Sequence, residues 1–164
     1  MNRLLGVERL LVSWEIGGAL QFEIEARKDG AKSIEAEHML LALTASPDNE
    51  AAKLLHEFGL DQQRLESALR EERRRTLAFA GIKAPAEKLV DATELNSPLS
   101  LGTSAKSAIR RALIGAHRDR RRARLRSIDL LAGILEAELG TVPRALAIAG
   151  IDREALMSRA RESS

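Results

Sequence analysis

The stretch that decides the fold runs from His38 to Glu72, HMLLALTASPDNEAAKLLHEFGLDQQRLESALREE, because the chain contains a related copy of it. Shifted by 91 positions, it falls without a gap on residues 129–163, DLLAGILEAELGTVPRALAIAGIDREALMSRARES. Leucines align with leucines, and a Gly-apolar-Asp junction recurs at residues 59–61 and 150–152. A self-similarity of this kind indicates one structural unit that is built twice.

The repeated unit has the marks of consecutive helices. Apolar residues recur three and four positions apart within residues 51–58 and 62–69, which is the period of a helix with one buried face. Gly59 suits the left-handed residue that follows a helix, and Asp61 suits the N-cap of the next one. Their counterparts 91 positions later repeat the same junction.

The helix boundaries follow from the glycine, proline and capping residues between the helices. We interpret Ser46 and Pro47 as an N-cap followed by a first-turn proline, and no segment shows the alternation of a strand. The predicted helices lie near residues 13–28, 36–45, 48–58, 61–75, 103–120, 128–138, 141–149 and 152–161.

The predicted fold is therefore all-α, with two pseudo-twofold-related four-helix repeats packed into one domain. Proline, glycine and an Asn-Ser-Pro turn mark the segment between the repeats as a connector. The expected parts are an N-terminal arm at 1–12, a first repeat at 13–75, a connector at 76–102 and a second repeat at 103–164.

Composition excludes several classes of protein. The chain has no cysteine, so disulfides, thiolate metal sites and cysteine nucleophiles are excluded. Aromatic residues are 2% of the chain, too few for base-stacking platforms. No apolar segment reaches the length of a membrane span or has the form of a signal peptide, so we expect a cytoplasmic protein that binds no membrane. Neither a nucleophile–base pair nor a metal constellation is present, and we predict no enzyme activity, cofactor or metal.

Several of these features together resemble a known family. Glu37 and His38 open an LLAL-type helix, an AA..LL..FGLD pattern follows at residues 51–61, and the whole unit is duplicated. This combination resembles the Clp amino-terminal repeat, found at the front of ClpA- and ClpC-type AAA+ unfoldases, and it covers roughly residues 13–75 and 103–162.

The resemblance implies a docking function without chemistry. In the family the double four-helix module receives adaptor proteins and some substrates and passes them to ATPase rings. No ring follows the second repeat in this sequence, so we expect an accessory, decoy or regulator that binds Clp unfoldase or protease subunits, their adaptors or their clients.

The resemblance also implies docking residues. Glu37 matches a motif glutamate that is implicated, in ClpC-type members, in receiving arginine-phosphorylated substrates. Ile128 stands at the equivalent place of the second repeat, so two such sites are not expected. An aromatic residue in the family lines a ligand-accepting surface where this chain has Leu101, with Lys106 nearby. The implied docking residues are thus Glu37, Leu101 and Lys106.

His38 has a plain structural interpretation. Its repeat counterpart is Asp129, and no His-Glu-x-x-His spacing for a metal is present. An acidic residue such as Glu37 or Asp129 in a first helical turn is favoured by the helix dipole without any catalytic role. We therefore interpret Glu37 and His38 as a helix start, and expect the hydroxyl of Ser127 to cap the corresponding helix of the second repeat.

Arginines crowd the segment at residues 110–126. One interpretation is a solvated face, and another is a patch for an acidic partner protein formed by Arg118, Arg120, Arg121, Arg122, Arg124 and Arg126. The alternative function is that of a nucleic-acid-associated helical protein, which would bind through this segment with a steep dependence on salt.

Overall fold

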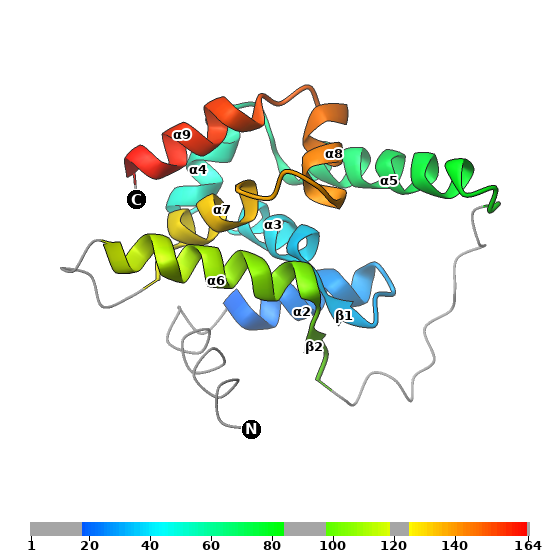
Figure 1. Ribbon diagram of the computed structural model, residues 1–164, viewed down its shortest axis with the longest axis horizontal. Coiled ribbons are helices and arrows are strands. Elements are labelled where there is room, and N and C mark those ends of the chain that lie inside the picture. Colours follow the sequence, from blue (N-terminus) through cyan, green and yellow to red (C-terminus); the bar gives the residue numbers. More distant parts are fainter. Residues whose placement is uncertain (1–17, 84–97, 119–124, 164) are drawn as a thin grey trace.

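The computed structural model describes residues 18–83, 98–118 and 125–163, and these residues form an all-α fold (Figure 1). The predicted fold class is therefore confirmed. The helices of the described part are α2 (Gly18–Lys28), α3 (Ala36–Ala45), α4 (Glu50–Glu57), α5 (Gln62–Phe79), α6 (Thr103–Arg118), α7 (Ser127–Leu135), α8 (Thr141–Ile148) and α9 (Arg153–Ser163). None of these helices has the length and apolar character needed to cross a membrane.

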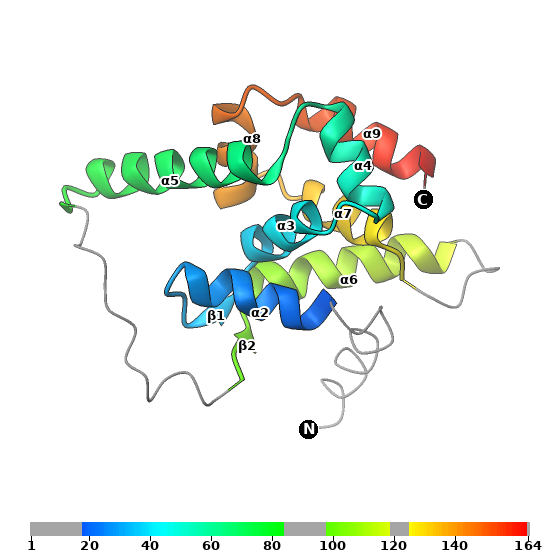
Figure 2. The same cartoon turned by 180° about the vertical axis from the view of Figure 1, so that it is seen from behind.

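The helices lie close to the ranges predicted from the repeat, and α5 departs from its predicted range most. α5 continues to Phe79, into the segment that the sequence assigns to the connector. Its far end projects beyond the other helices (Figures 1 and 2). The predicted arm at 1–12 and the connector residues 84–97 lie outside the described part of the chain.

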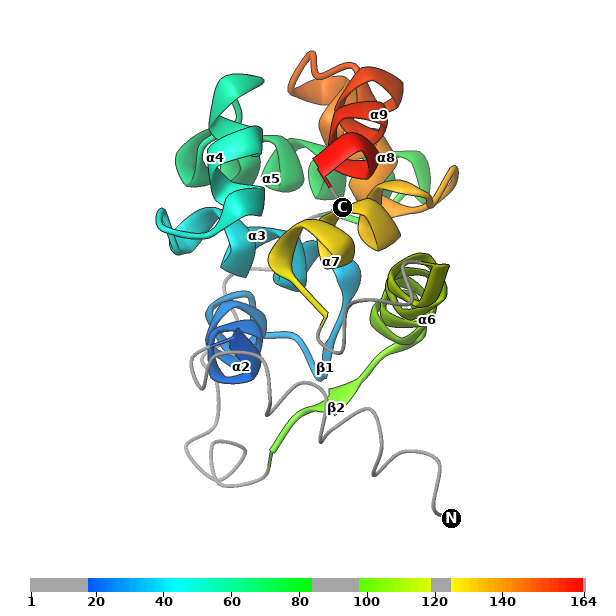
Figure 3. The same ribbon diagram turned by 90° about the vertical axis from the view of Figure 1, so that its left-hand side faces the viewer.

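The core centres on α3 and α7, which occupy equivalent places in the two repeats. Figure 3 shows them in the middle of the molecule, with α2 and α6 on one side and the remaining helices on the other. Both are apolar on nearly all faces, which is the pattern of a fully buried helix. Leu40 and Leu131, which the repeat aligns, are both completely buried in this core.

The predicted helix junctions are confirmed. Gly59 and Gly150 have φ of 74° and 70°, in the left-handed region that favours glycine. The Asp61 carboxylate accepts the Arg64 N–H at 2.7 Å, and Asp152 accepts the Ala155 N–H at 3.0 Å. Each aspartate thus satisfies a backbone donor that the first helical turn leaves unpaired.

The predicted N-cap at Ser46 is wrong. α4 begins later, and its N-cap is Asn49, whose side-chain oxygen accepts the Ala52 N–H at 2.7 Å. The same amide donates to the Ser46 carbonyl at 2.7 Å, at the end of α3. An amide can serve both helices because it has a donor and an acceptor, so Asn49 takes the capping position and Pro47 lies in the loop.

A short strand pair was not predicted. β1 (Ser33–Ile34) and β2 (Ser100–Leu101) run parallel, with Ser33 opposite Ser100 and Ile34 opposite Leu101. The Gly102 N–H extends the pairing by donating to the Ile34 carbonyl at 2.8 Å. Strands of this length cannot show an alternating pattern in the sequence. The pair brings the start of α3 next to the start of α6 (Figure 3).

Candidate functional site

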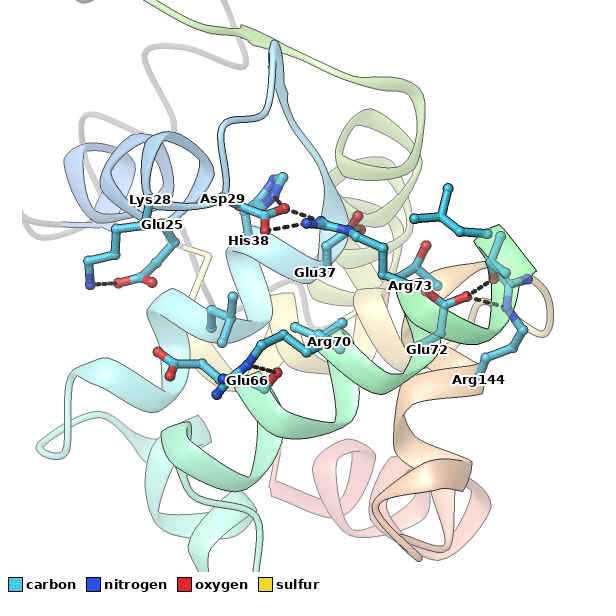
Figure 4. A pocket seen from close by; sticks show the side chains of 15 residues that line it. Glu25, Lys28, Asp29, Glu37, His38, Glu66, Arg70, Glu72, Arg73 and Arg144 are labelled. Atoms are coloured by element: carbon cyan, nitrogen blue, oxygen red, sulfur yellow. Dashed lines mark hydrogen bonds and ion pairs between the residues drawn. The ribbon is translucent and has the colours of Figure 1, made fainter. Parts of the chain in front are cut away.

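A cleft of about 450 Å³ opens between helices of both repeats (Figure 4). α2, α3 and α5 of the first repeat form most of it, and α8 of the second repeat completes it. Its lining combines charged residues with a few leucines: Glu25, Lys28, Asp29, Glu37, His38, Leu41, Glu66, Leu69, Arg70, Glu72, Arg73, Thr76, Leu77, Thr141 and Arg144.

Glu37, a predicted docking residue, lines this cleft from the first turn of α3. Its side chain is half-buried, and no other residue in the described part of the chain donates a hydrogen bond or forms an ion pair with its carboxylate. Burial raises the pKa of Glu37, and the nearby carboxylates of Glu35 and Asp29 add to the rise. Glu37 is thus a carboxylate whose charge the fold leaves without a direct partner.

Asp29 lies near Glu37, and both of its carboxylate oxygens have hydrogen-bond partners. Arg73 donates to both Asp29 oxygens, with Nη1 at 2.7 Å from Oδ1, and His38 Nε2 lies 3.3 Å from Oδ2. Burial opposes the ionisation of Asp29, but the hydrogen bonds from His38 and Arg73 outweigh it and lower the pKa to about 2. This network joins α5 to the turn after α2 (Figure 4).

Replacement of Asp29 with asparagine should destabilise the protein in a pH-dependent way. The pKa of Asp29 falls from an ordinary 3.8 to about 2 on folding, so its contribution is present above pH 4 and is lost as the pH falls toward 2. We expect D29N to lower the free energy of unfolding at neutral pH by about 1–2 kcal/mol, allowing for partial exposure. Urea unfolding at a series of pH values should show this difference narrowing in acid, and a difference independent of pH would contradict the account.

His38 has the structural role that the sequence predicts. It is buried, and its Nδ1 accepts the Glu35 N–H at 2.9 Å, which leaves Nε2 to carry the proton toward Asp29. In the second repeat the Asp129 carboxylate accepts the Arg126 N–H at 2.8 Å, at the equivalent position. Histidine and aspartate thus perform the same capping task, which confirms the interpretation as a helix start.

The predicted capping role of Ser127 is wrong. Ser127 lies inside the first turn of α7, after the N-cap residue Arg126. Its hydroxyl instead accepts the Ala51 N–H at 3.3 Å, at the beginning of α4. Ser127 therefore caps α4, a helix of the other repeat, and not its own helix.

Glu35 is an important residue that the sequence did not reveal. Its carboxylate accepts the Ser104 N–H at 3.1 Å and the hydroxyls of Ser104 and Ser33 at 2.5 and 2.9 Å. Burial opposes the ionisation of Glu35, but these hydrogen bonds outweigh it and lower the pKa. The Ser104 hydroxyl in turn accepts the Ala36 N–H at 2.9 Å, so the starts of α3 and α6 cap each other. No sequence pattern signals this contact, because its partners lie 69 positions apart.

The other implied docking residues lie outside the cleft. Leu101 is half-buried in β2 and pairs with Ile34, and Lys106 is exposed on α6. Neither residue is part of the cleft lining that contains Glu37. Their docking role remains a prediction about the neighbouring surface.

Most of the predicted arginine patch lies outside the described residues or side chains, namely Arg118, Arg120, Arg121, Arg122 and Arg124. Arg126, the described member, is half-buried and is held by contacts within the protein. Its Nη1 lies 3.3 Å from Glu50 Oε2, and its Nη2 donates to the Ser163 carbonyl at 2.8 Å. Arg126 therefore connects α4 and α9 to the start of α7.

Comparisons with known proteins agree with this architecture. The family model described as "Clp repeat (R) N-terminal domain" matches residues 22–118, and a search of curated protein sequences finds no match.

Two solved structures are similar over most of their length. One is the N-terminal domain of the caseinolytic-protease-associated chaperone ClpD from Arabidopsis thaliana, with a TM-score of 0.59, 18% identity and 89% of each chain covered. The other comes from a structural investigation of a malarial protein secretion system, with a TM-score of 0.59, 16% identity, and 99% of this chain and 92% of that chain covered. The structural likenesses show a shared fold, and the family model covers more than half of the sequence. The chain therefore belongs to the family of Clp repeat N-terminal domains.

Proposed function

We propose that this chain is a non-catalytic docking module that binds Clp unfoldase or protease subunits, their adaptors or their client proteins. Membership of the Clp repeat family supports a role as a protein-interaction module of Clp systems. The observation that carries the proposal is the half-buried carboxylate of Glu37, which has no described partner and faces a cleft between the two repeats. An ionic group left unpaired in a cleft is available to a bound partner.

The cleft would act through binding alone. His38 is its one imidazole, and both of its ring nitrogens already serve the fold, one toward Glu35 and the other toward Asp29. A histidine that acts as a general base needs a free ring nitrogen within reach of a substrate proton, and His38 offers none. Presentation of clients, competition for adaptors and regulation of an assembled complex would all use the same binding surface.

A pull-down from native cytosol tests the proposal. Tagged wild-type protein and the E37Q variant are compared at near-physiological salt, with and without nuclease, and bound proteins are identified by mass spectrometry. We expect Clp subunits, a Clp adaptor or Clp clients to be retained after nuclease treatment and to be recovered about tenfold less by E37Q.

The nucleic-acid alternative gives the opposite result. Ribosomal or nucleoid proteins would dominate the captured material and would be lost after nuclease treatment. Their recovery would fall steeply as the salt concentration rises, because binding to nucleic acid releases counterions. In the described part of the arginine-rich segment, Arg111 donates to the Gly133 carbonyl and Arg126 to the Ser163 carbonyl, each at 2.8 Å, while Arg110 is exposed. Loss of the captured proteins on nuclease treatment would overturn the docking proposal.

A further inference from the structure

One face of α2 carries apolar side chains that point away from the core. Phe22 and Ala26 of this helix are buried, and α3 is the main neighbour of α2. Leu20 and Ile24 are one turn apart and are 61% and 37% exposed. Since an α-helix turns by about 100° per residue, Leu20 and Ile24 lie on the side opposite the buried pair. The outer face of α2 is therefore apolar at a place where most surface helices are polar.

The polar side chains beside Leu20 and Ile24 are engaged within α2 itself. Arg27 Nη2 lies 2.5 Å from Glu23 Oε1, and Lys28 Nζ lies 3.0 Å from Glu25 Oε1. Figure 3 shows α2 at the edge of the molecule, with its outer face open to solvent among the described helices. This face thus suits an apolar occupant better than a charged one.

The chain has an apolar segment directly next to this face. Residues 1–17, MNRLLGVERLLVSWEIG, lie outside the described residues and lead into Gly18, the first residue of α2. We call them the N-terminal segment. Its sequence places apolar residues at intervals of three and four, which is the spacing of one helix face, at Leu4, Val7, Leu11 and Trp14.

The length of the N-terminal segment and the place where it ends suit the outer face of α2. Residues 4–14 are as many as the residues of α2, which has 11. Gly17 stands at the junction, and glycine allows backbone conformations that reverse the direction of the chain. A segment that is tethered beside its binding face is present there at a high effective concentration, so a small apolar contact is enough to hold it.

We propose that the N-terminal segment folds back on α2 of the same molecule and covers Leu20 and Ile24 with its apolar side chains. A reversal at Gly17 brings Trp14 near Leu20 and Leu11 near Ile24. The docked segment shields this apolar face from contact with other proteins. The inference is independent of the proposed docking function, because neither Leu20 nor Ile24 lines the cleft.

Tryptophan fluorescence tests the proposal with the full-length protein. Trp14 is the single tryptophan of the chain and tyrosine is absent, so the emission reports on the N-terminal segment alone. We expect Trp14 of the wild type to emit at short wavelength, as a tryptophan shielded from water does, and to be quenched only weakly by acrylamide. Both properties should be independent of protein concentration, because the docking occurs within one molecule.

A double variant with a matched control locates the docking face. L20Q/I24Q should expose Trp14 to acrylamide, since each replacement removes an apolar contact and lowers the ratio of docked to undocked segment about tenfold. I82Q/L139Q is the control. It also replaces one leucine and one isoleucine, at positions that are 55% and 89% exposed and lie after α5 and before α8. Trp14 in this control should behave as in the wild type.

A change within the N-terminal segment tests the same contact from its other side. L11Q leaves every described residue unchanged, so its effect does not depend on the stability of α2. It should expose Trp14 as L20Q/I24Q does, and it should add little to L20Q/I24Q, because both changes remove one shared contact. Circular dichroism should show that all variants keep the helices of the fold.

Several results would overturn the proposal. Ready quenching of Trp14 in the wild type would show that the face is uncovered, and protection that survives L20Q/I24Q would show that the segment packs elsewhere. Equal exposure of Trp14 in L20Q/I24Q and I82Q/L139Q would remove the assignment to α2. Protection that increases with protein concentration would assign the face to the N-terminal segment of a second copy.

Discussion

Replacement of Gly133 with alanine should be among the most damaging single changes in this protein, with a loss of about 2–4 kcal/mol in the free energy of unfolding. Gly133 lies in α7 where it packs on α6, and a Cβ there would meet the Ala108 carbonyl oxygen at 2.4 Å and the Ala112 nitrogen at 2.7 Å. Both contacts are backbone atoms, so the helices themselves would have to separate. Urea unfolding monitored by circular dichroism measures the loss.

Gly115 provides a matched control for this prediction. It lies in α6, and a Cβ added there would meet no atom within 4 Å. Alanine at that position should stabilise the helix by about 0.5–1 kcal/mol, because glycine is the poorer helix former. Equal effects of G133A and G115A, or a neutral G133A, would contradict the close approach of α6 and α7.

Replacement of Arg144 with leucine should have the second large effect. Arg144 of α8 pairs with Glu72 of α5, and Glu72 is only 5% exposed, with the Thr76 hydroxyl as its other donor at 2.8 Å. Loss of the arginine leaves a buried carboxylate without its cation, at an expected cost of about 2–3 kcal/mol. The double variant E72M/R144L should recover much of this stability, since it removes the stranded charge. Equal loss in the single and double variants would contradict this explanation.

A second ion pair between the repeats serves as the comparison. Arg159 of α9 lies 3.6 Å from Glu57 of α4, with 56% and 62% of the two side chains exposed. Exposed pairs of this kind contribute little, so R159L should cost less than about 1 kcal/mol. Both ion pairs join the same two repeats, so the difference between the two losses in stability measures the effect of burial.

The repeat and its punctuation predict the fold well, because they depend on local physics. Helix period, the left-handed glycines and the N-cap aspartates act within a few residues of each other, and each leaves its pattern in the sequence. The internal comparison of His38 with Asp129 was also informative. Histidine in one repeat and aspartate in the other indicate a role that both side chains can perform. Accepting a backbone N–H at the start of a helix is such a role.

The cleft could be predicted only in part. The resemblance to the Clp family predicts Glu37 as a docking residue, whereas its neighbours in the cleft depend on contacts between distant positions. Arg73 reaches Asp29 across 44 positions, and Arg144 reaches Glu72 across 72. Helix periodicity shows which face of a helix is buried, but it does not show which distant helix covers that face.

Site-specific photo-crosslinking in cells tests whether partners dock in the cleft, by placing a benzophenone side chain at Leu77 in the cleft and, separately, at Asp48 outside it. Irradiation followed by mass spectrometry identifies whatever lies against each position. We expect the Leu77 position to capture Clp unfoldase or protease subunits, their adaptors or their clients. E37Q should weaken this capture, and the Asp48 position should not capture the same proteins. The same set of proteins at both positions, or capture at Leu77 that E37Q leaves unchanged, would contradict docking in the cleft.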